Sequence, residues 1–236
     1  MKLSNRLEMV VSFVKPGESA ADVGTDHGHV PVELVRRGIV KRALAMDVRK
    51  GPLSKAEENI AAAQVADKIE TRLSDGVKKL AAGEADSVII AGMGGELVIH
   101  ILEDGRHMWE TVEQWVLSPH SEIHKVREWI DGHGFMITKE DMVYEEGKFY
   151  TVMDVRRTED SESGESPKTE KDFRYSIYLR KKKNPVFLDY LKDEEQKLLS
   201  LKENLLKQVE HSERAKDSLR EVEEKLSMNR EVQDEM

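Results

Sequence analysis

A strand pattern that runs into a glycine-rich corner constrains this chain more than any other feature. Residues 19–28 have the sequence SAADVGTDHG, and a predicted helix follows them. In an open α/β sheet, glycines between a strand and a helix let the backbone approach a ligand closely. Asp47 ends the next apolar run, at a spacing that suits a carboxylate bound to the two hydroxyls of a ribose. The corner therefore predicts a site for a compound that contains adenosine.

Apolar runs alternate with helical spacing as far as residue 157. Strands that alternate with helices favour parallel pairing in a sheet covered on both faces. After these elements, two strand patterns on either side of a glycine-containing turn predict an antiparallel hairpin. We therefore expect an α/β fold with a class I, Rossmann-like methyltransferase sheet, mostly parallel and closed by that hairpin. The predicted strands are 20–24, 43–48, 69–73, 87–91, 114–117, 135–143 and 148–155, and the predicted helices are 31–37, 53–65, 77–81, 97–102 and 123–131.

The bulk properties of the 236 residues limit the possible functions. No apolar run reaches the roughly 18–20 residues that span a bilayer, and the first residues lack a signal-peptide core. The chain has no cysteine, which excludes disulfides and thiolate sites and fits the cytoplasm. We expect no metal site and no membrane segment. The net charge of −9 argues mildly against nucleic acid as a partner, although basic clusters occur at 36–50 and 180–183.

The composition changes after the predicted hairpin. Residues 158–169 are rich in Ser, Glu, Gly and Pro and predict a linker between a domain at 1–157 and a helical domain at 170–236. A short helix is expected at 170–183. Beyond it, apolar residues follow heptad spacing and predict a coiled-coil-like hairpin that turns near 210–214, with Ser212 as a helix cap. The same apolar stripe suits pairing with a second chain, so we expect a monomer or a weak dimer through these helices.

The glycine corner discriminates between two adenosine-containing cofactors. A nicotinamide site needs G-x-G-x-x-G, whereas this corner has G-x-x-x-G, in which Gly24 and Thr25 lie between Asp22 and Asp26. Two carboxylates repel a pyrophosphate but attract the ammonium and sulfonium groups of S-adenosylmethionine. The charges therefore favour S-adenosylmethionine, with His27 orienting the loop or contacting the cofactor.

Three later segments complete the predicted cofactor site. Asp47 is placed for the ribose, and Val48 for one face of the adenine. Asp75 and Gly76 follow the third strand, where a carboxylate can accept the adenine amino proton. The loop at 91–96, AGMGGE, includes Ala91 and Gly92 and leaves room for two ligands. It lacks the Asn/Asp-Pro-Pro-aromatic motif of many amino-methylating enzymes, which points to a ring nitrogen as the acceptor.

Several of these motifs resemble the bacterial TrmK family, tRNA methyltransferases that act on N1 of adenine 22. The resemblance implies a class I domain, S-adenosylmethionine, a tRNA substrate and a C-terminal helical hairpin. The chain departs from the family at His29, where an aromatic residue is usual, at Asp47, where glutamate is common, and at Ser118, where glutamine is common. The segments that carry the resemblance are 3–7, 21–28, 51–52, 75–76, 90–95 and 145–150.

The resemblance suggests roles for further residues. Asp26 is the candidate for orienting the target adenine or offsetting the charge that develops on it. His29 and Met93 are candidates for packing on the flipped base. Arg6 is expected to reach the cofactor carboxylate or an RNA phosphate. Alternative functions are a methyltransferase with a small-molecule or protein acceptor, a nicotinamide oxidoreductase and a non-catalytic scaffold.

Overall fold

The computed structural model describes residues 3–158, 168–208 and 213–236. Its contacts divide the chain into two units, Met1–Ser166 and Pro167–Met236. The predicted linker at 158–169 and the predicted turn near 210–214, with the Ser212 cap, lie largely outside the described residues. Within them, no helix combines the length and the apolar character needed to cross a membrane.

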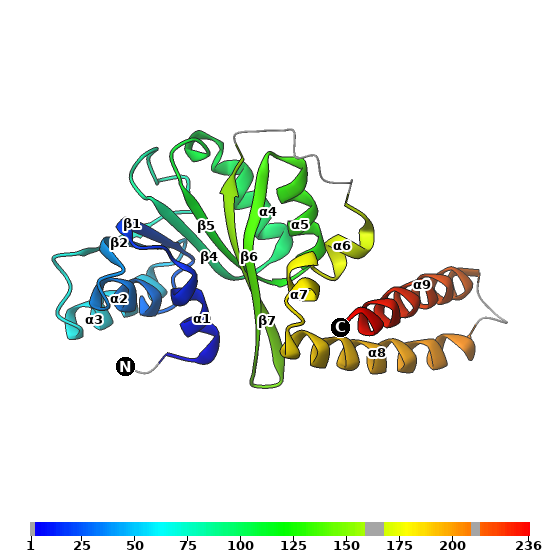
Figure 1. Cartoon of the computed structure of the whole chain (residues 1–236). Helices are drawn as coiled ribbons and strands as arrows, with labels where there is room; N and C mark the ends of the chain where they lie inside the picture. Colours follow the sequence, from blue (N-terminus) through cyan, green and yellow to red (C-terminus); the bar gives the residue numbers. More distant parts are fainter. Residues whose placement is uncertain (1–2, 159–167, 209–212) are drawn as a thin grey trace. The chain divides into compact units, whose positions relative to one another are not determined.

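The first unit is built on a seven-stranded sheet with the order β3-β2-β1-β4-β5-β7-β6 (Figure 1). Strands β1 to β5 pair in parallel, whereas β7 runs antiparallel to both β5 and β6. This confirms the predicted sheet and its closing hairpin. The strands are β1 (Gly17–Val23), β2 (Val40–Asp47), β3 (Ile69–Leu73), β4 (Ser87–Gly94), β5 (Gln114–Ser121), β6 (Phe135–Glu145) and β7 (Lys148–Arg157).

The helices of this unit form two groups on opposite sides of the sheet (Figure 1). α2 packs against α1 and α3, and α4 packs against α5. α1 was not predicted; Ser4 caps it by accepting a hydrogen bond from the Leu7 amide, and Val10 and Val11 are buried. The helices are α1 (Asn5–Phe13), α2 (His29–Arg36), α3 (Lys50–Ala62), α4 (Gly95–Asp104) and α5 (Ile123–Gly132), with a 3₁₀ turn at η1 (Arg106–Met108).

One predicted helix and one predicted strand end in this unit are wrong. The segment predicted as a helix at 77–81 is a turn. Ser74 Oγ donates to Gly76 O at 2.9 Å and accepts from Lys79 N at 3.2 Å, so a side chain satisfies backbone groups that a helix would pair. β5 runs past its predicted end at residue 117 and carries His120 to the sheet edge.

The second unit consists of α6 (Glu170–Arg174), α7 (Ile177–Lys181), α8 (Pro185–Leu206) and α9 (Glu213–Glu235). The helix predicted at 170–183 breaks at Tyr175, which is fully buried, and at Ser176, whose φ of 29° is not helical. α8 and α9 pair antiparallel: Asn229 donates to Leu191 O near one end, and Lys202 meets Glu223 farther along.

Candidate cofactor and acceptor site

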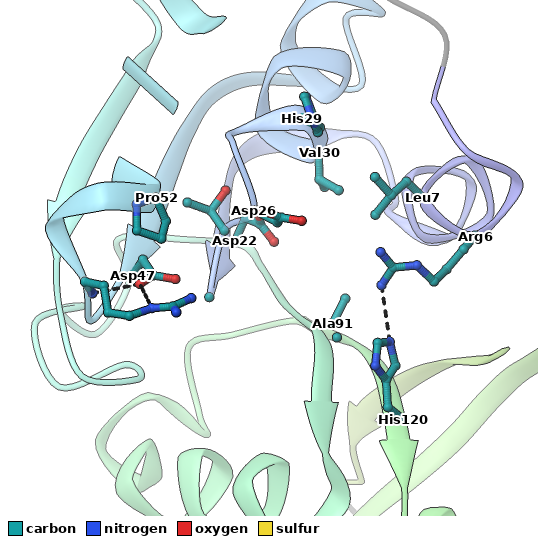
Figure 2. A pocket seen from close by; sticks show the side chains of 14 residues that line it. Arg6, Leu7, Asp22, Asp26, His29, Val30, Asp47, Pro52, Ala91 and His120 are labelled. Carbon is teal, nitrogen blue, oxygen red and sulfur yellow. Dashed lines mark hydrogen bonds and ion pairs between the residues drawn. The ribbon is translucent and has the colours of Figure 1, made fainter. Parts of the chain in front are cut away.

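A pocket of about 310 Å³ opens at the carboxyl ends of the parallel strands (Figure 2). This is the edge at which open α/β sheets bind ligands, and the volume lies in the range of small-molecule sites. The pocket is lined by Arg6, Leu7, Asp22, Gly24, Thr25, Asp26, His29, Val30, Asp47, Arg49, Pro52, Ala91, Gly92 and His120.

Three carboxylates form one side of the pocket (Figure 2). Asp22 and Asp47 are each only 6% exposed, at the ends of β1 and β2, whereas Asp26 stands in the open loop. Burial raises the pKa of Asp22 to about 6, and the charges of Asp26 and Asp47 act in the same direction. Asp47 Oδ1 accepts from the Arg49 amide at 2.7 Å, which fixes its carboxylate. Asp47 Oδ1 also pairs with Arg49 Nε at 3.6 Å, so Asp22 and Asp26 are the carboxylates better placed to receive a cation from a ligand.

The glycine corner brings the backbone up to the ligand space. The amides of Gly24 and Thr25 both donate to Met46 O at 2.8 Å, which turns the chain sharply after β1. Gly24 has a φ of 73°, and a Cβ there would lie 2.0 Å from Met93 Cε. Gly28 also has a positive φ, 71°, and packs against Ala56 of α3. The positive φ favours glycine at both positions, and a larger residue at Gly24 would also displace the end of the Met93 side chain.

Arg6 and His120 form the other side of the pocket (Figure 2). Arg6 Nη1 lies 3.2 Å from His120 Nε2, and the two residues come from α1 and β5. The amide of Arg6 and that of Asn5 face the Glu145 carboxylate, at 3.4 and 2.6 Å. The pocket therefore sets a guanidinium opposite three carboxylates.

Two histidines lie at the start of α2. The rings of His27 and His29 stack with centroids 5.7 Å apart, and His27 Nε2 lies 3.1 Å from Asp26 Oδ1. Among the described residues, the buried His29 Nδ1 has no hydrogen-bond partner. Burial, and after it the nearby His27, lowers the pKa of His29. A neutral, half-buried ring that lines the pocket suits contact with a base.

The structure brings most of the predicted site residues to one pocket and leaves five outside its lining. Val48 lies beside Asp47 and is 59% exposed. Asp75 is exposed and paired with Lys78 at 2.5 Å, which lowers its pKa. The predicted residues that line the pocket are Arg6, Asp22, Gly24, Thr25, Asp26, His29, Asp47, Ala91 and Gly92, and those that do not are His27, Val48, Asp75, Gly76 and Met93.

Five lining residues were not predicted as site residues: Leu7, Val30, Arg49, Pro52 and His120. Leu7 belongs to α1, a helix that was not predicted from the sequence. His120 ends β5, so the rule that ligands bind at the carboxyl ends of parallel strands would have found it had the strand been extended.

The lining fits S-adenosylmethionine, a zwitterionic amino acid joined through a sulfonium to adenosine. The ammonium and sulfonium are positive and suit the three carboxylates, whereas the carboxylate suits Arg6. His29 Nδ1 is buried without a hydrogen-bond partner in the described parts of the chain, and buried polar groups are rarely left unpaired.

Several known proteins are similar to this chain. The methyltransferase domain family matches residues 3–153. The tRNA (adenine(22)-N(1))-methyltransferase of Bacillus subtilis (strain 168) is 30% identical over 234 residues, 99% of this chain and 98% of that protein. A crystal structure of B. subtilis TrmK is 29% identical, with a TM-score of 0.87 over 98% of this chain and 99% of that one.

A structure of Streptococcus pneumoniae Sp1610 in complex with S-adenosyl-L-methionine is 33% identical. Its TM-score is 0.85, and the match covers 98% of this chain and all of that chain. The matches to the B. subtilis and S. pneumoniae proteins extend through both units, whereas the family model covers the first unit. They confirm the family that the sequence motifs predicted: the chain belongs to the tRNA (adenine(22)-N(1))-methyltransferases.

Proposed function

We propose that this protein transfers a methyl group from S-adenosylmethionine to N1 of adenine 22 in tRNA. The observation that carries the proposal is the pocket in which Asp22, Asp26 and Asp47 face Arg6. Its charges match the sulfonium cofactor and disfavour a pyrophosphate. The full-length relation to the B. subtilis enzyme supports the acceptor.

The residues of the pocket suggest how the cofactor is held. S-adenosylmethionine, when bound, supplies an electrophilic methyl group. Asp22 pairs with its ammonium, and Arg6 with its carboxylate. Asp47 binds the ribose hydroxyls. We further propose that exposed Val48 covers one face of the adenine ring. Asp75 would accept a hydrogen bond from the adenine amino group, beside Gly76.

Adenine N1 carries a free lone pair at neutral pH, so the acceptor needs no general base. The protein must hold the flipped base in line with the methyl group and stabilise the positive charge that develops on the ring. Asp26 is exposed at the mouth of the pocket and is proposed to bind the adenine amino group and offset this charge. His29 and Met93 are proposed to pack on the ring.

The proposal is tested with labelled S-adenosylmethionine and a panel of tRNAs that carry adenine 22, followed by mass analysis of the nucleosides. The expected product is 1-methyladenosine, lost when adenine 22 is replaced by guanine. Label in a protein or small molecule but not in tRNA would favour a different acceptor. Failure of the protein to bind S-adenosylmethionine would support a scaffold role.

Replacement of Asp26 by alanine tests the acceptor side of the pocket separately. We expect Asp26→Ala to lower the methylation rate about 100-fold, in the range of one electrostatic contact to a transition state. Cofactor affinity should change less than about threefold, because Asp22 and Asp47 remain. Rates come from single-turnover assays and affinities from calorimetry. Unchanged turnover would exclude the proposed role.

The remaining expectations concern partners and compartment. We propose a monomer, or a weak dimer through the C-terminal helices, since α9 covers α8 within the same chain. Mass measurement in solution at several concentrations separates the two states. The cytoplasm stays the predicted compartment.

A further inference from the structure

Side chains from two strands of the sheet contact the Arg6 guanidinium. Besides the 3.2 Å contact to His120 Nε2, its central carbon lies 5.3 Å from the centroid of the Tyr150 ring. The His120 and Tyr150 rings contact each other, with centroids 5.2 Å apart and planes at 64°. α1, β5 and β7 thus each contribute one side chain to a single cluster beside the pocket.

The chemistry of the Arg6 contact fixes the state of His120. A guanidinium has donors and no acceptor, so Nε2 must accept and the ring proton must lie on Nδ1. A protonated imidazole would instead put a second cation against Arg6. Only neutral His120 can therefore hold Arg6 in this place.

The surroundings of His120 favour that neutral state. Arg6 lies against it from α1, and Lys148 and Tyr150 belong to β7, while Glu145 of β6 binds the Arg6 backbone. Partial burial, and then the charges of Arg6 and Lys148, lowers the pKa of His120.

We propose that His120 is a positioning residue for the cofactor: neutral His120, backed by Tyr150, holds the Arg6 guanidinium against the pocket, where it receives the carboxylate of S-adenosylmethionine. This inference rests on the proposed cofactor. In this proposal His120 acts on the ligand only through Arg6. His120 therefore contributes to the binding of ligands that carry the carboxylate and not to the binding of others.

Two ligands separate positioning from a general structural effect. S-adenosylmethionine has the amino-acid carboxylate, and 5′-methylthioadenosine lacks it. We expect His120→Ala to weaken S-adenosylmethionine binding about tenfold, comparable to a hydrogen bond to a charged group, and to leave 5′-methylthioadenosine binding unchanged. His120→Gln offers a carbonyl acceptor and should stay within about threefold of the wild type. His100→Gln, on the exposed surface of α4, is the matched control and should change neither affinity.

The pH dependence supplies a second readout. Because the pKa of Asp22 is about 6, its titration is removed by comparing Asp22→Asn with the Asp22→Asn, His120→Gln double variant by calorimetry from about pH 8 down to about pH 5. The single variant should lose more affinity than the double variant as the pH falls and His120 gains a proton. Superimposable profiles, or equal weakening of both ligands by His120→Ala, would overturn the inference. Absence of S-adenosylmethionine binding by the wild type would instead count against the proposed function.

Discussion

Asp22 affects both the stability of the fold and the binding of a cation in the pocket. Its pKa of about 6 in the folded chain lies above the ordinary value of 3.8. Between these values the folded chain binds more protons than the unfolded chain, so stability falls as the pH rises through this window. At neutral pH the buried charge is unfavourable by up to about 3 kcal/mol in the absence of a ligand.

Asp22→Asn should therefore stabilise the ligand-free protein by about 1–3 kcal/mol at pH 8, and by only about a third as much at about pH 4.5. It should also weaken cofactor binding at pH 8, because the ammonium loses its partner. Denaturant titrations at the two pH values give the first result, and calorimetry gives the second. Asp67→Asn changes an exposed aspartate and should leave both quantities unchanged. Equal stabilisation of Asp22→Asn at both pH values would contradict the pKa argument.

Gly24 permits a second test at the residue scale. Gly24→Ala has to accommodate a positive φ and a Cβ 2.0 Å from Met93 Cε. Gly38 has a similar φ, 68°, and a Cβ at that position would meet no described atom within 4 Å. Gly38→Ala therefore isolates the cost of the backbone conformation, about 1 kcal/mol. We expect Gly24→Ala to cost more and to weaken cofactor binding, and Gly38→Ala to spare binding. Thermal melts and calorimetry on both variants provide the comparison.

At the scale of elements, a buried ion pair joins α5 to the hairpin that closes the sheet. Arg127 Nη2 lies 2.6 Å from Glu140 Oε1, and the two side chains are 6% and 0% exposed. Glu140→Gln removes the carboxylate from this buried pair and should destabilise the protein by about 3 kcal/mol. Glu113→Gln breaks the exposed pair with Lys15 and should cost less than about 1 kcal/mol. Urea titrations would reject the argument if the two losses were equal.

The elements also show which features the sequence could predict. Buried parallel strands are continuous apolar runs, so the positions of the strands along the chain and the closing hairpin could be predicted from the pattern. α1 could not be predicted because its packing on β6, β7 and α2, rather than a long amphipathic pattern, stabilises it. The predicted helix at 77–81 does not form, because the Ser74 side chain hydrogen-bonds to the backbone of Gly76 and Lys79. The spacing of apolar residues gives no sign of these hydrogen bonds.

The residues of the candidate site also differ in whether the sequence could predict them. Asp22, Gly24 and Asp47 could be predicted because strand ends and glycine turns fix where they lie. His120 was not assigned because its strand was predicted to end at residue 117, and its contact with Arg6 spans 114 residues of sequence. A local pattern specifies the turn at the end of one strand, but it does not specify which distant side chain meets that turn.

For the whole molecule, the net charge of −9 has to be reconciled with a polyanionic substrate. Arg180, in the basic run at 180–183, is committed to Asp172 and Glu235 within its own unit. Lys181, Lys182 and Lys183 are exposed. Phosphate contacts are therefore expected from the lysines of the run rather than from its arginine.

The triple variant Lys181→Gln, Lys182→Gln, Lys183→Gln should bind tRNA several-fold more weakly at low salt. The slope of its salt dependence should fall by about 1 for each phosphate that these lysines no longer neutralise. A triple change at Lys41, Lys55 and Lys216, which pair with nearby acids, alters the net charge equally and should have a smaller effect. Filter binding across a salt series measures both. An equal decrease in affinity for the two variants would assign the effect to net charge alone.

The Glu145 contact to the start of α1 has a consequence for how the protein is made. Glu145 follows Asn5 by 140 residues, so α1 leaves the ribosome long before the carboxylate that binds its first amides. His120 also emerges late. A nascent chain that ends before the β6–β7 hairpin contains Arg6 without the Glu145 and Tyr150 contacts. Competence to capture the methyl donor should therefore arise in one late step of translation, when the hairpin joins the sheet.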